Sequence, residues 1–243
     1  MLRSADGLRG SSLQAIDGEI GKVDDLYFDD SGWRVRYLVA NTGSWLSGRR
    51  VLLSPLAVTG TPKHDGQVLV NLTTDQVRNS PEIDAAQPVS RQQEIELHNH
   101  YGWNYYGFPS GINGIHPVPA VLPRDGAGAD RPRDPHLRSV REVTGYQIRA
   151  TDAELGHVED LIVDVASWQI RYMVVDTAAL WLGRKVLISP RSIREVDWSR
   201  QAVDIALSED EIKQAPEWDG EVPVDPEYDE KLSSHYRGIS YVV

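Results

Sequence analysis

The clearest pattern of apolar and polar positions is an alternation between residues 33 and 39, with Leu38 the one apolar residue at an intervening position. Its apolar positions are Trp33, Val35, Tyr37 and Val39. A period of two places one apolar face against a core, so the pattern predicts a strand. The alternation returns as Trp168, Ile170, Tyr172 and Val174. The chain therefore carries two predicted strands of the same kind.

The alternation is part of a longer stretch that the chain contains twice. Residues 17–55 pair without a gap with residues 152–190, each with the residue 135 positions later. The pairs include Gly21 with Gly156, Trp33 with Trp168 and Arg49 with Arg184. A self-match of this length predicts two copies of one structural unit.

Further apolar runs predict the other strands of each copy. We expect a first strand around Leu8, Gly10 and Leu13, and two segments at residues 20–23 and 26–28. A short run at residues 51–53 ends at a Ser-Pro pair, and a final strand follows with three inward positions. These inward positions are Val68, Val70 and Leu72, matched by Val203, Ile205 and Leu207.

Each copy then changes to a helical pattern. Thr73–Gln76 and Ser208–Glu211 are capping boxes, and each predicts a short helix because a proline soon follows. A second helix is predicted in both copies, begun by Ser90–Gln93 in the first and by Asp225–Pro226 in the second. Side chains four residues apart mark its buried face: Leu97 and Tyr101, and Leu232 and Tyr236.

These patterns predict a mainly β fold of two small β-barrels in tandem, each followed by short helices. Residues 1–108 form the first repeat with a helical and aromatic tail, and residues 138–243 form the second. Residues 109–137 are rich in proline and glycine and form a predicted linker. We expect the repeats to pack together as an internal pseudo-dimer, because a duplicated unit can bury the patch that a homodimer would use.

Composition and charge exclude several classes of partner and site. The net charge of −11 argues against a nucleic-acid partner, because phosphate binding needs a basic face. No apolar run approaches the ~20 residues that span a bilayer, and no secretion signal precedes the first copy. The absence of cysteine excludes disulfides and thiolate metal sites. We therefore expect a cytoplasmic protein without a membrane span.

Three motifs recur in the same order in both copies. They are Gly-x-Val-x-Asp-Leu at residues 21–26 and 156–161, Trp-x-x-Arg-Tyr-x-Val, and a Gly-Arg pair leading into Val-Leu-x-Ser-Pro. This arrangement resembles the PRC-barrel family, named for the cytoplasmic part of the photosynthetic reaction centre H subunit, and in particular its free-standing tandem bacterial members. The resemblance implies a docking or assembly module and supplies no catalytic residues. We expect no cofactor.

Two polar groups have both a chemical and a structural interpretation. The first is an acidic group that could hold a hard cation: Asp17, Glu19, Asp24, Asp25, Asp29 and Asp30. It lacks the regular oxygen-ligand spacing of a calcium loop, so we interpret its members as turn-formers and solvated strand ends. The second is the pair His98 and His100, of which only His100 recurs, as His235. We expect no metal site there, and expect His100 and His235 to cap or pack at a helix end.

Two tryptophan loops are the candidate partner-binding sites. The candidates are Trp45, Leu46 and Arg49 in the first copy, and Trp181, Leu182 and Arg184 in the second. The two tryptophans are out of register by one position, a slip that a strict core position does not easily tolerate. An aromatic anchor beside a cation is common in binding hot spots. The alternative is that both tryptophans fill a barrel mouth or the interface between the lobes.

The leading hypothesis is a non-enzymatic module that docks another protein, because a whole structural unit is duplicated without any catalytic constellation. The alternative is a small-ligand-binding protein or an enzyme with a site between the two lobes, where pockets often lie. A filled, apolar interface favours docking. A deep pocket with converging carboxylates and histidines favours the alternative.

Overall fold

The computed structural model describes residues 1–60, 66–81, 91–103, 137–177, 184–218, 220 and 224–237. The predicted linker at residues 109–137 lies outside this part of the chain apart from Leu137. Ser90, the expected N-cap of the second helix of the first copy, lies outside it as well.

The two halves of the chain contain similar series of elements. The strands of the first half are β1 (Leu2–Ser4), β2 (Ser12–Gln14), β3 (Glu19–Asp29), β4 (Arg34–Asn41), β5 (Arg50–Leu53) and β6 (Gln67–Leu69). Its helices are α1 (Ala5–Leu8), α2 (Thr74–Arg78) and α3 (Arg91–Tyr101), with 3-10 turns η1 (Gly43–Leu46) and η2 (Pro55–Ala57).

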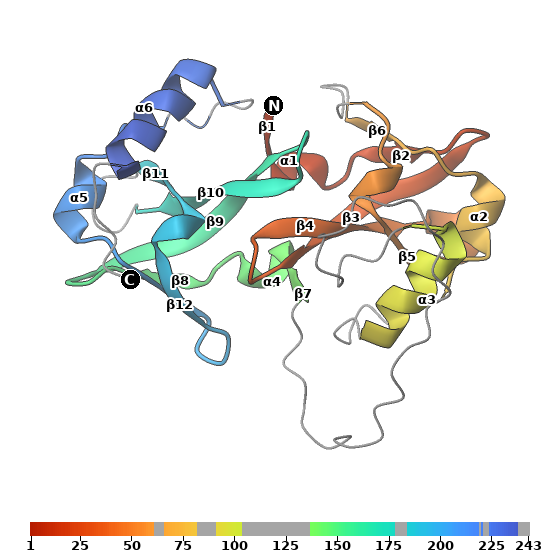
Figure 1. Cartoon of the computed structure of the whole chain (residues 1–243), viewed down its shortest axis with the longest axis horizontal. Coiled ribbons are helices and arrows are strands. Elements are labelled where there is room, and N and C mark those ends of the chain that lie inside the picture. The colour runs from red at the N-terminus through yellow and green to blue at the C-terminus, as the bar shows by residue number, and fades with distance from the viewer. Residues whose placement is uncertain are drawn as a thin grey trace, which may run out of the picture.

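The second half repeats most of this order and has one additional strand between its 3-10 turn and its last strand. Its strands are β7 (Leu137–Ser139), β8 (Gln147–Arg149), β9 (Glu154–Asp164), β10 (Gln169–Asp176), β11 (Lys185–Ile188), β12 (Ile193–Asp197) and β13 (Ala202–Ile205). Its helices are α4 (Val140–Val143), α5 (Glu209–Lys213) and α6 (Pro226–Arg237), with the 3-10 turn η3 (Pro190–Ser192). The helices α3 and α6 lie at opposite ends of the molecule (Figure 1).

The strands of both halves belong to one sheet. Within the described residues it has 13 strands, and its main path runs β12-β13-β8-β9-β10-β4-β3-β2-β6. The halves meet where β10 pairs antiparallel with β4, at Gln169 and Arg34. The mainly β prediction is therefore confirmed. The description as two separate barrels in a pseudo-dimer stays a prediction.

The first strand of each half also pairs with a strand of the other half. β1 pairs antiparallel with β9, with Leu2 opposite Asp164. β7 pairs antiparallel with β3, with Leu137 opposite Asp29. The two pairings are reciprocal, since each residue of one corresponds to the residue 135 positions away in the other. Reciprocal contacts of this kind are the mark of an isologous interface.

Trp33 and Trp168 lie just before β4 and β10 rather than inside them. Both have left-handed backbone geometry, with φ of 50° and 58°. Both are also buried, at 9% and 7% exposure. Their interpretation as core residues is confirmed, and the alternating positions that follow in each strand are buried as predicted: Val35, Tyr37, Val39, Ile170, Tyr172 and Val174.

Gly21 and Gly156 occupy the same special position in β3 and β9. Their φ angles are +123° and +126°, in a range that L side chains rarely adopt. A Cβ atom on Gly21 would lie 2.0 Å from the carbonyl oxygen of Asn41, and one on Gly156 would lie 2.0 Å from that of Asp176. Both glycines therefore let two strands approach more closely than any other residue would permit.

Several local predictions from the sequence are confirmed. Both capping boxes form, at Thr73–Gln76 and Ser208–Glu211. Asp225 accepts hydrogen bonds from the backbone N–H groups of the first turn of α6, as an N-cap does. The inward positions of the final strand are all buried: Val68, Val70, Leu72, Val203, Ile205 and Leu207.

The predicted first strand around Leu8, Gly10 and Leu13 is wrong in its first part. Leu8 belongs to helix α1, and Gly10 lies in a turn with φ of 81°. Only Leu13 is in a strand, β2. The helix forms because the side chain of Ser4 accepts a hydrogen bond from the N–H of Gly7 and so caps its first turn.

The two segments predicted at residues 20–23 and 26–28 are one strand, β3, with a bulge where its pairing to β4 shifts between Val23 and Asp25.

No helix in the described part of the chain is long and apolar enough to cross a membrane.

Candidate functional site

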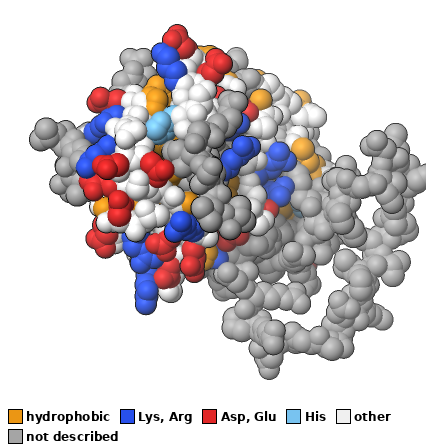
Figure 2. Space-filling view, turned by 60° about the vertical axis from the view of Figure 1, so that its left-hand side comes forward, with side chains coloured by type: hydrophobic (Ala, Val, Ile, Leu, Met, Phe, Trp, Pro, Cys, Tyr) orange, Lys and Arg blue, Asp and Glu red, His pale blue; other side chains and the backbone are white. Residues whose placement is uncertain are grey.

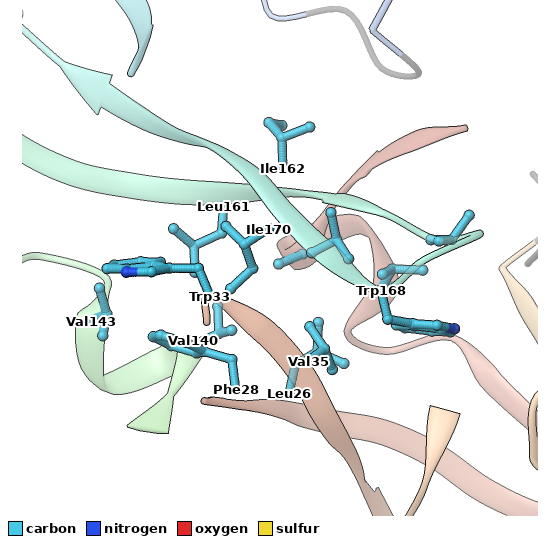
Figure 3. Close-up of a cluster of buried hydrophobic side chains, with 14 of the residues drawn as sticks. Leu26, Phe28, Trp33, Val35, Val140, Val143, Leu161, Ile162, Trp168 and Ile170 are labelled. Carbon is cyan, nitrogen blue, oxygen red and sulfur yellow. The ribbon is translucent and has the colours of Figure 1, made fainter. Parts of the chain in front are cut away.

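The two halves are joined by an apolar core that draws on both of them. Figure 3 shows Leu26, Phe28, Trp33 and Val35 of the first half together with Val140, Val143, Leu161 and Ile170 of the second. Trp33 stacks on Phe28, with ring centroids 5.2 Å apart. We call this contact zone between the halves the seam. Buried apolar side chains of both halves pack at its centre.

The backbone reinforces the seam with a reciprocal pair of hydrogen bonds. The N–H of Val35 donates to the carbonyl of Trp168 at 2.8 Å, and the N–H of Ile170 donates to the carbonyl of Trp33 at 2.8 Å. The left-handed geometry of the two tryptophans thus turns their carbonyl groups towards the opposite half.

Two carboxylates, the buried Asp25 and the half-buried Asp160, complete the seam, and each caps a short helix of the other half. Asp25 accepts from the N–H of Leu26 at 2.8 Å, from the hydroxyl of Ser139 and from the N–H of Arg141 at 3.2 Å. The last two donors belong to the N-terminal end of α4, in the second half.

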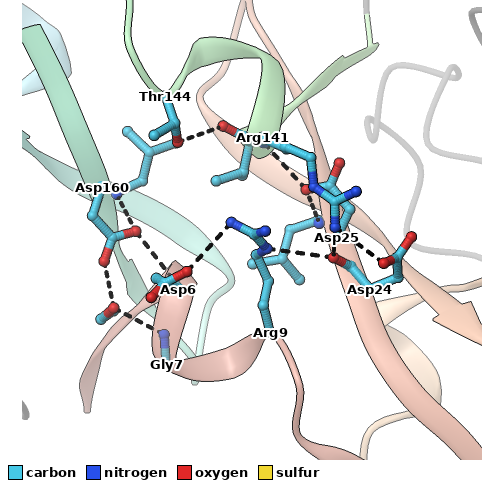
Figure 4. A network of polar contacts seen from close by, with 12 residues as sticks. Asp6, Gly7, Arg9, Asp24, Asp25, Arg141, Thr144 and Asp160 are labelled. Carbon is cyan, nitrogen blue, oxygen red and sulfur yellow. Dashed lines mark hydrogen bonds and ion pairs between the residues drawn. The ribbon is translucent and has the colours of Figure 1, made fainter.

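Asp160 repeats this arrangement at the N-terminal end of α1. It accepts from the N–H of Leu161 at 2.7 Å, from the hydroxyl of Ser4 and from the N–H of Asp6 at 3.1 Å. Figure 4 shows Asp25 and Asp160 on either side of the two short helices. Burial raises the pKa of Asp160 above its usual value, while the hydrogen bonds that it accepts act in the opposite direction.

A groove with a volume of about 580 Å³ opens beside this network. Trp45 on η1 forms part of its lining, together with Arg9, Lys22, Asp24 and Arg141. We call it the Trp45 groove. Arg9 follows helix α1, whereas Arg141 comes from α4 in the other half. The groove therefore exists only because the seam brings the two short helices to the same place.

Charged groups in the Trp45 groove are organised around Asp24. Arg141 donates to the Asp24 carboxylate at 3.0 Å, and Arg50 pairs with the same carboxylate at 3.1 Å. Arg9 reaches the Asp24 carbonyl oxygen at 3.4 Å and pairs with Asp6 at 3.3 Å. The sequence did not indicate Arg9, Lys22 or Arg141 as site residues, because no local pattern records which residues the seam brings together.

Trp45 is half-buried and packs against the core. The guanidinium carbon of Arg78 lies 5.4 Å from the centre of its ring, within the range of a cation–π contact. Leu46 is half-buried as well. Trp181 and Leu182 lie outside the described residues. Whether the two tryptophan loops contact a partner stays a prediction.

Arg49 and Arg184 bind carbonyl groups of their own chain. Arg49 donates to the carbonyl of Arg78 at 3.0 Å and to that of Ser80. Arg184 makes the same contacts 135 positions later, to the carbonyls of Lys213 at 3.0 Å and Ala215 at 2.7 Å. Both side chains satisfy carbonyl groups where the short helices α2 and α5 end.

The acidic group of the sequence is distributed over structural contacts. Asp17 accepts from the N–H of Thr74 at 2.8 Å, and Asp30 pairs with Arg138 at 2.9 Å. Burial raises the pKa of Asp29, but hydrogen bonds from Ser31 and Arg36 outweigh it and lower that pKa to about 2. The described part of the chain holds no group of three or more histidine, aspartate or glutamate side chains placed to bind a metal ion.

The repeated histidines contact the short helices. The Nε2 atom of His100 lies 2.9 Å from the carbonyl oxygen of Gln76 in α2, and that of His235 lies 3.0 Å from the carbonyl of Glu211 in α5. His98 is buried instead, with its Nε2 atom 3.0 Å from the hydroxyl of Tyr37. The interpretation of His100 and His235 as helix contacts is thus confirmed, although the helix concerned is the preceding one.

Charges are interspersed over the end of the molecule that carries α5 and α6. Figure 2 shows acidic and basic side chains next to each other across the visible part of that end. Mixed charge of this kind is typical of a solvent-exposed surface, whereas a surface that binds a nucleic-acid phosphate backbone is mainly basic.

A comparison with known families gives one domain match, in the first half of the chain. Residues 4–77 match the model of the PRC-barrel domain. A comparison with curated proteins gives no match. The family resemblance seen in the sequence is confirmed for the matched residues, which run from the end of β1 into α2.

Proposed function

We propose that this protein, whose residues 4–77 form a PRC-barrel domain, is a non-enzymatic docking module built from two such barrels joined as an internal pseudo-dimer. The repeated order of elements and the reciprocal pairing of β1 with β9 and β7 with β3 support the second barrel and the pseudo-dimer. The apolar side chains that fill the centre of the seam favour docking over an enzyme site at that centre.

The observation that carries the proposal is the Trp45 groove. It combines a half-buried tryptophan with three cationic side chains, Arg9, Lys22 and Arg141, and two carboxylates, Glu19 and Asp24. The cations outnumber the carboxylates in the groove, on a protein whose net charge is −11. Aromatic side chains and arginine are enriched in binding hot spots. Lys22 is exposed, and no carboxylate among the described residues forms an ion pair with it.

The groove fits one kind of occupant, a segment of another protein that carries an apolar side chain next to an acidic one. The apolar side chain would pack on Trp45, and the carboxylate would meet Lys22, since Arg141 already pairs with Asp24. Leu46 follows Trp45 on η1 and is half-buried, but it does not line the groove. Arg49 takes no part, because its guanidinium group binds carbonyls of its own chain.

A photo-crosslinking amino acid at Ser44, which is exposed and lines the groove, tests the proposal in extracts of the native host. The same amino acid at Ser199, an exposed turn position of the second half, is the control. We expect a saturable product at Ser44 alone. A synthetic peptide of the crosslinked segment should then bind directly in calorimetry and contain an acidic residue beside an apolar one.

Trp45→Ala should weaken binding of that peptide at least about tenfold, the loss expected from one hot-spot side chain. Trp198→Ala removes a half-buried tryptophan elsewhere and should leave the affinity unchanged. The docking proposal is wrong if Ser44 and Ser199 give the same products, or if the peptide binds equally well to the Trp45→Ala and Trp198→Ala proteins.

A further inference from the structure

A second cavity, with a volume of about 650 Å³, opens at an edge of the seam. The turn at Ser31 and Trp33 of the first half forms one wall, and β10, η3 and α6 of the second half form the others. Small-ligand sites in proteins have volumes of roughly 300–1,000 Å³. No carboxylate is among its described lining residues, which include two arginines, Arg171 and Arg191. We call it the Arg191 pocket.

Arg171 is only loosely paired. Its counterpart in the first half, Arg36, donates to Asp29 at 2.8 Å. Arg171 instead lies 3.7 Å from the carboxylate of Asp229, and 41% of its side chain is exposed. Asp229 also accepts a hydrogen bond from the hydroxyl of Tyr172 at 2.5 Å. An ion pair this long leaves guanidinium donors of Arg171 for a further acceptor.

Arg191 adds a second cation to the same cavity. It lies on η3 and is exposed, and no carboxylate of the described residues forms an ion pair with it. Two hydroxyl groups, of Ser189 and Ser233, line the cavity as well. Arginine and hydroxyl groups together are a common set of donors for carboxylate and phosphate oxygens.

The corresponding cavity of the other half shows that this chemistry is not imposed by the fold. That cavity has a volume of about 490 Å³ and is formed in part by equivalent positions, from Pro55 on η2 and from the turn that ends at Trp168. Leu56 occupies the position of Arg191 and is 57% exposed. The barrel therefore accepts an apolar side chain there, and the charge of Arg191 is not needed for packing.

We propose that the Arg191 pocket binds a small molecule with a carboxylate or phosphate group. Its anionic group is held between Arg171 and Arg191, and its body packs on Ile170 and Pro190 at the cavity wall. The sequence left open a small-ligand site between the two lobes. The Arg191 pocket places such a site at the edge of the seam, whereas buried side chains fill the centre of the seam. It shares no lining residue with the Trp45 groove, so either proposal can fail alone.

Titration with inorganic phosphate and with citrate, each at constant ionic strength, tests the proposal. The reporters are the Nε–Hε signals of Arg171 and Arg191 in NMR spectra of the whole protein. We expect both signals to shift and to saturate with one dissociation constant, for at least one of the two probes. Arg191→Leu should raise that constant by about tenfold or more, the effect of one charge-assisted hydrogen bond.

Arg194→Leu is the matched control, because it removes the same charge from an exposed position three residues away that does not line the pocket. It should change the constant by less than about twofold, the effect expected of a distant surface charge. Arg191→Leu should keep the melting temperature, since Leu56 holds that position in the first half. Equal effects of the two variants, or shifts that stay linear with both probes, would show screening by added ions and overturn the proposal.

Discussion

Alanine at Gly21 is expected to destabilise the protein by at least about 4 kcal/mol, a loss larger than most single substitutions cause. The new Cβ atom would lie 2.0 Å from the carbonyl oxygen of Asn41 in the neighbouring strand. The alanine residue would also have to adopt a backbone φ angle of +123°. The obstacle is backbone rather than the end of a flexible side chain, so β3 and β4 would have to separate where Lys22 pairs with Asn41. Alanine at Gly156 meets the carbonyl of Asp176 in the same way.

Urea unfolding followed by circular dichroism measures this loss. Gly43→Ala is the control, because Gly43 also has a positive φ, of +59°, but nothing within 4 Å of the added atom. It should cost only about 1 kcal/mol, the penalty of the left-handed conformation alone. If Gly21→Ala and Gly43→Ala cost the same, the close approach of the two strands does not exist.

Alanine at Trp33 or at Trp168 is expected to cost about 3–5 kcal/mol, as for other large aromatic side chains removed from a core. Both side chains are more than nine-tenths buried, and both belong to the apolar core that contains side chains of the two halves. Two losses of similar size are expected because the positions are equivalent in the two copies.

Trp45→Ala is the matched control for this pair, since Trp45 is only half-buried. It should cost about 1–2 kcal/mol, in proportion to the smaller apolar area that it removes from water. Equilibrium unfolding by urea, detected by circular dichroism to avoid the changed tryptophan fluorescence, gives all three values. A loss below that of Trp45→Ala at both seam tryptophans would mean that the seam is not a core.

The sequence predicted those parts of the fold that are encoded locally. The alternation at residues 33–39, the capping boxes and the inward positions of the final strand each depend on residues close in the chain. Helix α1 was missed although Ser4 caps it, because a helix of four residues has no apolar period to recognise. The exchange of β1 and β7 was missed as well, because pairing across more than 100 positions leaves no local pattern.

The candidate site was predicted in part for the same reason. Trp45 was identified from its position in a repeated loop. The contact of Arg49 with a partner stays a prediction; in the structure its guanidinium group binds carbonyls at the end of α2. The cations that do line the groove, Arg9 and Arg141, come from helices of opposite halves. Their proximity follows from the seam and from nothing in the sequence around either residue.

Both proposed sites lie on the seam, so the account depends most on the claim that the two halves form one intertwined unit. A protease site inserted within residues 109–137, followed by cleavage of the purified protein, tests it directly. Native mass spectrometry at micromolar concentration should still find one particle with the mass of the whole chain, 27.2 kDa plus the insertion. It should unfold in a single transition, because each half holds a strand and a helix cap of the other. Two separate folded fragments with their own melting temperatures would contradict the account.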